Sequence, residues 1–116
     1  MKILEELITT KPEEQVIYTY CYRLTCDDFS IRIGDKASKF KAYGIEVERK
    51  DFKETSIENI ERSSISNISP YRHKVKALLN IIYKNNVSPI HLVDIIGNYV
   101  DECACDYEEN IIEKSV

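Results

Sequence analysis

Four cysteines are the residues of this chain best suited to chemistry, because thiolates bind zinc and act as nucleophiles. A closed zinc site needs four such ligands, usually in pairs separated by two residues, but here four residues separate one pair and one residue separates the other. We therefore expect reduced, metal-free thiols and keep a zinc or thiol protein as a second alternative. The candidate metal ligands are Cys21, Cys26, Cys103 and Cys105.

Histidine could supply the base that a nucleophilic cysteine needs, and the chain has only His73 and His91. His91, Asp94 and Asn98 have the i, i+3, i+7 spacing of one helical face, which resembles a histidine oriented by a carboxylate. A solvated polar helix face explains the same spacing more simply. The three glycines are scattered singly, and no GxSxG or HExxH motif is present. We predict no catalytic residues, no cofactor and no enzymatic activity.

A basic stretch is the most suggestive feature of the sequence. Residues 62–93 contain no acid and five basic residues, and the helix predicted within this stretch would turn its basic side chains to solvent. Such a face could bind phosphates, an acidic protein surface or the chain's own acidic end. A solvated face balanced by the tail is the simpler interpretation. The candidate partner-binding residues are Arg72, His73, Lys74, Lys76, Tyr83 and Lys84.

Negative charge is concentrated at the C-terminus. Residues 101–116 have a net charge of −5, which leaves about +1 for residues 1–100. We predict a single domain over residues 1–102 and an acidic tail over 103–116. The overall pI of about 5.2 makes a nucleic-acid partner less favoured than a protein, because DNA-binding domains are usually basic.

The elements that would position these residues begin with a short helix around residues 3–8, which Pro12 would end. Alternating residues then predict strands over 16–24 and 29–33, joined as a hairpin by a turn at Asp27 and Asp28, and a third strand over 43–47. Residues 55–62 fit either a fourth strand or a short helix. The tyrosine stripe of residues 18, 20 and 22 could stack on nucleic-acid bases, but we expect it in the core.

The C-terminal part predicts two helices. Ser69 and Ser88 each precede a proline, the pattern of an N-cap followed by the first helical residue. The first helix should end near Asn85 and Asn86, which tolerate left-handed geometry. The predicted fold is therefore α+β: an antiparallel β-meander of three to four strands followed by a C-terminal αα-hairpin packed on one sheet face.

The composition is that of an ordinary globular protein, with 43% hydrophobic and 31% charged residues. No run of residues reaches the roughly 20 apolar residues of a membrane span, and two glutamates interrupt the N-terminal apolar stretch. We expect a cytoplasmic protein without membrane contacts. A homodimer is possible, because a small open sheet leaves edges that a second copy can pair.

Three segments carry a family resemblance: YTYCYRL, YGIEVER and SNISPYRHKVKALLNIIYKNNVSPIHLVDIIGNYVDE. They resemble a family of small clostridial proteins that is a domain of unknown function, over about residues 16–102. The resemblance implies a Firmicute host and brings no catalytic residues. By analogy, small cytosolic proteins of this kind act as regulatory or adaptor partners.

The function that we expect is a non-enzymatic protein-interaction or regulatory module, acting through the basic helix face or an exposed sheet edge. The alternative is a nucleic-acid-binding regulator that uses the αα-hairpin as a helix-turn-helix.

Overall fold

The computed structural model describes residues 1–109, except for the side chains of Ile31 and Ile33. Four strands are followed by two helices. One short 3-10 turn lies between the helices, and another follows the second helix. The strands are β1 (Lys2–Glu13), β2 (Val16–Ile33), β3 (Lys36–Lys53) and β4 (Ser56–Ser69). The helices are α1 (Arg72–Lys84) and α2 (Leu92–Glu102), and the 3-10 turns are Pro89–His91 and Cys103–Cys105.

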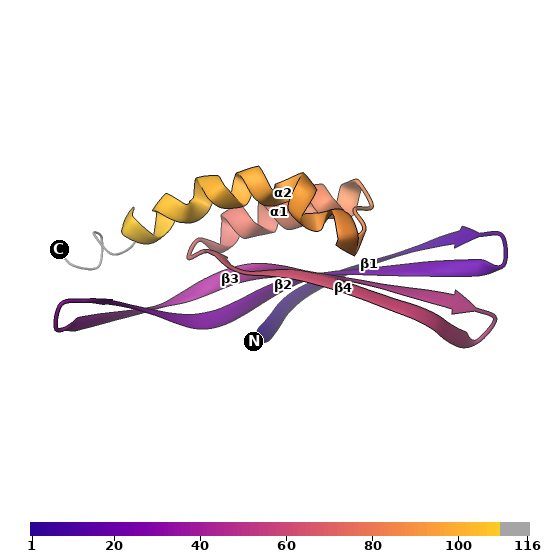
Figure 1. Cartoon of the computed structure of the whole chain (residues 1–116), viewed down its shortest axis with the longest axis horizontal. Helices are drawn as coiled ribbons and strands as arrows, with labels where there is room; N and C mark the ends of the chain where they lie inside the picture. Colours follow the sequence, from indigo (N-terminus) through magenta and orange to yellow (C-terminus); the bar gives the residue numbers. More distant parts are fainter. Residues whose placement is uncertain (110–116) are drawn as a thin grey trace.

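The strands form one antiparallel meander in the order β1-β2-β3-β4, which places β1 and β4 at the edges of the sheet. Both helices lie over one face of the sheet, here called the covered face, and the opposite face is called the open face (Figure 1). The predicted α+β class and meander are confirmed, and an αα-hairpin describes the helical layer approximately. No helix within residues 1–109 is both long and apolar enough to cross a membrane.

The first element is a strand, so the predicted helix over residues 3–8 is wrong. β1 pairs with β2 from Lys2 to Glu13, with one register shift between Ile3 and Glu5. The apolar residues of this segment are also compatible with a strand, because Leu7 packs against the core while Ile8 lies on the open face. Pairing with the long neighbouring strand therefore overrides the local helical spacing.

The second strand is twice as long as predicted, since no turn occurs at Asp27 and Asp28. These residues pair with Ala42 and Lys41 of β3, and the chain reverses only after Ile33. Gly34 takes a φ of +62°, the left-handed geometry that a two-residue hairpin turn requires. β3 consequently starts at residue 36, before the third strand predicted over 43–47.

The remaining two hairpin turns contain no glycine. Glu14 and Glu54 take left-handed φ values of 53° and 58°, a conformation for which glutamate gives no sequence signal. Residues 55–62, left open between strand and helix, belong mainly to β4. Near the end of β4, its pairing register with β3 shifts between Tyr43 and Ile45. The two backbones lie so close there that a Cβ on Gly44 would be 2.5 Å from the carbonyl oxygen of Ile65. Glycine is required there by the close approach of two backbones.

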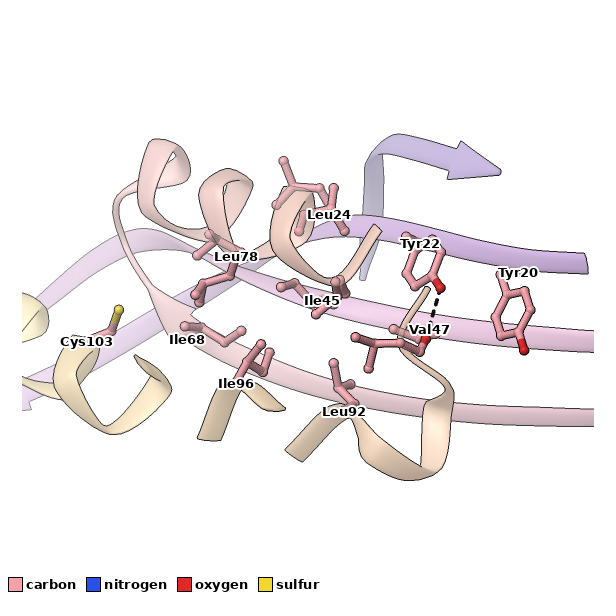
Figure 2. Packing of buried hydrophobic residues seen from close by; sticks show 14 residues of the cluster. Tyr20, Tyr22, Leu24, Ile45, Val47, Ile68, Leu78, Leu92, Ile96 and Cys103 are labelled. Carbon is pink, nitrogen blue, oxygen red and sulfur yellow. Dashed lines mark hydrogen bonds between the residues drawn. The ribbon is translucent and has the colours of Figure 1, made fainter. Parts of the chain in front are cut away.

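The core lies between the covered face and the two helices. Tyr20 and Tyr22 are buried in it, and the Tyr22 hydroxyl donates a hydrogen bond of 3.0 Å to the carbonyl oxygen of Val87 (Figure 2). This confirms the core interpretation for Tyr20 and Tyr22, and Tyr18 is partly buried against the same cluster. The other buried members of the cluster are Leu24, Ile45, Val47, Ile68, Val75, Leu78, Leu79, Ile82, Val87, Leu92, Ile96 and Cys103.

The helix starts differ from the predicted caps. The N-cap of α1 is Tyr71, and the Ser69 hydroxyl instead accepts a hydrogen bond from the Tyr71 N–H while donating one to Asp106. Ser88 precedes a 3-10 turn, so α2 begins only at Leu92. The end of α1 agrees with the prediction, because Asn86 takes a left-handed φ of 49°.

Residues 103–109, expected at the start of an acidic tail, pack against the domain. Cys103 and Asp106 are buried. The Tyr107 ring lies 5.1 Å and 5.7 Å from the rings of Phe29 and Phe40, and its hydroxyl donates a hydrogen bond of 2.6 Å to the Asn67 carbonyl. The rest of the predicted tail, 110–116, lies outside the described residues.

Candidate functional site

The basic helix face is partly neutralised by β1. Arg72 and Lys76 of α1 contact the same carboxylate, Glu5, at 3.2 Å and 2.8 Å. The hydrogen bonds from Lys76 and Arg72 hold the pKa of Glu5 below its ordinary value. Two of the predicted partner-binding cations are therefore paired within the chain. Together with Glu5 they have a net charge of only +1.

A second carboxylate, that of Asp106, pairs with Lys74. The Lys74 Nζ lies 2.7 Å from Asp106, which also accepts the hydrogen bond of 2.8 Å from Ser69. The hydrogen bond to Asp106 raises the pKa of Lys74. The expected neutralisation of the basic face by the chain's own acidic end is thus present at this one residue.

The other three predicted residues have separate surroundings. Tyr83, predicted to point to solvent, packs instead against the core, with its ring edge-on to Tyr22 at 5.9 Å. The helix turns this position toward the sheet because it lies four residues after Leu79, which is fully buried. His73 is exposed, with its ring 6.0 Å from that of Tyr71, and Lys84 is exposed at the end of α1. The six residues therefore form no continuous basic surface.

The open face carries a charge network that sequence reasoning missed. Arg23 donates hydrogen bonds to Glu6, Glu46 and Glu48 on both neighbouring strands. Glu48 is only 2% exposed and also contacts Arg62 of β4. Burial alone would raise the pKa of Glu48, but the hydrogen bonds from Arg62 and Arg23 lower it. The network ties β1 through β4 together, and the alternation of Glu46 and Glu48 was its only sequence signal.

The cysteines do not converge. Cys21 lies beside Ile8 and Glu48 in the sheet, on the face opposite the core tyrosines, whereas Cys103 belongs to the core cluster on the covered face. Among residues 1–109, no three His, Cys, Asp or Glu side chains are grouped as a metal ion would require. Burial raises the pKa of both thiols, which keeps them protonated at neutral pH.

His91 lies in the 3-10 turn before α2, whereas Asp94 and Asn98 lie on α2, and all three residues are exposed. Within the described part of the chain, no hydrogen bond or ion pair joins His91, Asp94 and Asn98. His91 does border a hollow of about 450 Å³ at the end of α1. The other residues of its lining are Asn85, Asn86, Val87, Ser88 and Ile95, a set that offers polar contacts without a second titratable side chain.

The outer edge of β4 is one of the two unpaired edges of the sheet in the described chain. Residues 59–65 pair with β3 in uninterrupted register on one side, and no strand of the described chain pairs with them on the other. Their sequence, NIERSSI, contains neither lysine nor proline, the residues that most commonly protect an edge, and its charged residues are Glu61 and Arg62. The β3–β4 hairpin also projects beyond the helices (Figure 1). Its backbone donors and acceptors can therefore be reached by another chain.

The opposite edge is less suited to pairing. β1 has a register shift between Ile3 and Glu5 and contains Pro12, which has no N–H to donate. Lys2 and Lys11 add positive charge near its two ends. Register shifts also flank residues 59–65 of β4, but that edge has no proline or lysine between the shifts, so it is the less protected of the two and is called the unprotected edge.

Apolar side chains continue from the unprotected edge onto the open face. Ile60 of β4 is 44% exposed, and Ile8 of β1, on the same face at the other edge, is 53% exposed. Ile17 and Ile57, which flank Phe52 in the register, are also exposed. A chain that pairs with β4 would find aliphatic contacts beside the backbone ladder.

Comparison with known proteins identifies the family. A family model described as a family of unknown function (DUF6514) matches residues 1–102, and the chain therefore belongs to this family. The prediction of a family of unknown function is confirmed, while the clostridial origin stays a prediction. Neither the curated proteins nor the solved structures contain a match to this chain.

Proposed function

We propose that this member of the DUF6514 family is a non-enzymatic interaction module that binds an extended protein segment at the outer edge of β4. The observation that supports this proposal is that residues 59–65 form a stretch of uninterrupted strand register along the unprotected edge of the sheet. Strand addition of this kind takes its affinity from backbone hydrogen bonds and its specificity from alternate side chains.

The side chains of β4 define the partner that would fit. Toward the open face the edge offers Ile60 and Arg62, and toward the covered face it offers Asn59 and Glu61. A complementary strand would place an aliphatic residue and an acid on one face and polar residues on the other. This argues for a protein segment rather than a nucleic acid, since Arg62 is the single basic side chain of residues 59–65.

The edge is preferred over the basic helix face, the other surface expected from the sequence. Arg72 and Lys76 are bound to Glu5, and Lys74 is bound to Asp106, so a partner would have to displace these carboxylates. The same pairing leaves little free charge for the phosphate contacts of a helix-turn-helix. A cytoplasmic location is supported by four unpaired cysteines, which suit a reducing compartment.

Two matched substitutions test the proposal. Ile60→Lys adds a charged side chain at the β4 edge, and Ile8→Lys makes the same change on the same face at the β1 edge. Tagged full-length protein and both variants are incubated with host lysate, and the proteins retained are quantified by mass spectrometry. We expect the Ile60→Lys variant to retain at most a tenth of the partner that the natural chain retains. The Ile8→Lys variant should retain as much as the natural chain. Equal retention by the two variants would contradict docking at β4.

A further inference from the structure

We infer that the strand seated on β4 is the β4 strand of a second copy of this chain. The inference rests on the proposed function and names the partner of the same edge. Two identical antiparallel strands can pair about a twofold axis perpendicular to the sheet, which keeps the open faces of both copies on one side. The result would be one continuous sheet with the four strands of each copy.

The sequence of β4 is self-complementary when the axis passes through Ile60. In that register Ile60 faces its own copy, and Glu58 of each chain lies opposite Arg62 of the other. Asn59 lies opposite Glu61, so an amide faces a carboxylate on the covered side. Each chain thus contributes one acid and one base to two symmetric ion pairs, which flank an aliphatic contact.

Neighbouring registers lack this match. An axis through Glu61 would place two glutamates opposite each other, and an axis through Arg62 would place two arginines opposite each other. Like charges directly opposite one another destabilise a strand pair. With an axis through Asn59 or through Ser63, Glu58 and Arg62 would each lie opposite an uncharged residue. The charge pattern therefore selects the register centred on Ile60.

The two charged side chains are available for these contacts. Glu58 is exposed, forms no ion pair within residues 1–109, and is the extra residue where the register shifts between Asp51 and Phe52. The Arg62 side chain is 63% exposed and contacts Glu48 through Nε, which leaves its terminal amino groups for a second carboxylate. Regular pairing about Ile60 spans residues 58–62, because beyond it Ile57 lies on the open face and Ser63 on the covered face. The tip of the β3–β4 hairpin, next to this stretch, projects beyond the helices (Figure 1).

A charge-swap experiment tests both the partner and the register. The Glu58→Arg variant would face arginine with arginine in both symmetric pairs. A second variant combines Arg62→Glu with Glu48→Gln, because a new carboxylate beside the buried Glu48 would otherwise repel it. In a dimer of this second variant, the glutamate introduced at position 62 of each copy would lie opposite Glu58 of the other, so glutamate would face glutamate. When the two variants are mixed, each arginine faces a glutamate again.

The mass in solution is measured by sedimentation equilibrium over a hundredfold range of concentration, with folding checked by circular dichroism. We expect a concentration-dependent dimer for the natural chain, with a dissociation constant of roughly micromolar because an edge contact is small. Each variant alone should associate at least tenfold more weakly, and their equimolar mixture should recover the dimer. Ile8→Lys should dimerise like the natural chain.

The failures of the two proposals are distinguishable. A natural chain that stays monomeric, or variants that associate as well as it does, would overturn pairing between copies. If Ile60→Lys then still lost a foreign partner that Ile8→Lys retained, docking at β4 would survive with another occupant. A natural dimer that neither charge variant weakens would overturn the register and the use of this edge.

Discussion

Replacing Asp106 should release the C-terminal segment from the domain. Asp106 is 2% exposed and accepts hydrogen bonds from Ser69 at 2.8 Å and Lys74 at 2.7 Å. A buried hydrogen bond to a charged group contributes about 1.5–3 kcal/mol, and the solvent-exposed Lys74 adds less because water screens it. We therefore expect Asp106→Ala to lower the free energy of unfolding by roughly 2 kcal/mol, a loss that comes mainly from the Ser69 bond.

Urea unfolding followed by circular dichroism measures this loss. With a slope on the order of 1.5 kcal/mol per molar, the midpoint should fall by about 1.3 M. Glu108→Ala is the matched control, because Glu108 is exposed and forms no hydrogen bond or ion pair within the described residues. The release should also expose Cys103, so a thiol reagent should modify it faster in the Asp106 variant. Equal midpoints for the two variants would refute the role given to Asp106.

Three further predictions concern the core, the thiols and pH. Tyr22→Phe removes the hydrogen bond to Val87 and leaves a buried carbonyl unpaired, which should cost about 1–3 kcal/mol in urea unfolding; an unchanged midpoint would contradict it. In the folded chain only Cys105 should react rapidly with an alkylating reagent, since the other three thiols are buried, and a count of two or more fast thiols by mass spectrometry would disagree. Because ion pairs lower the pKa values of Glu5 and Glu48 in the folded state, the stability they add is present above pH 4.5 and is lost as pH falls through the lowered values. Glu5→Gln should flatten this acid-side loss, and identical pH profiles would speak against it.

The fold class could be predicted because local signals determine most of it. Alternating residues indicate the two end parts of β2 and the middle of β3, and apolar spacing with a Ser-Pro start indicates both helices. The ends of β1 and β3 could not be predicted, because the hairpin turns that follow them rely on left-handed glutamates, Glu14 and Glu54. Asp27 and Asp28 suggested a turn, yet they pair within a long ladder whose cooperativity outweighs their local preference.

The basic residues could be predicted, but their surroundings could not. Glu5 is separated by 67 residues from Arg72 and by 71 from Lys76, and no local pattern connects positions so far apart. Once β1 proved to be a strand rather than a helix, its carboxylate came to lie against α1. The unprotected edge likewise depended on the strand order, which the sequence left open.

Hydrogen exchange tests the central claim, that the outer edge of β4 is the docking surface, most directly. Exchange of backbone amides is followed by mass spectrometry at low and high protein concentration, and again with any partner captured from lysate. We predict that protection increases over residues 58–62 on binding, while β1 and the exposed side of α1 exchange as before. Protection that appears on α1, with unchanged exchange over 58–62, would contradict the account.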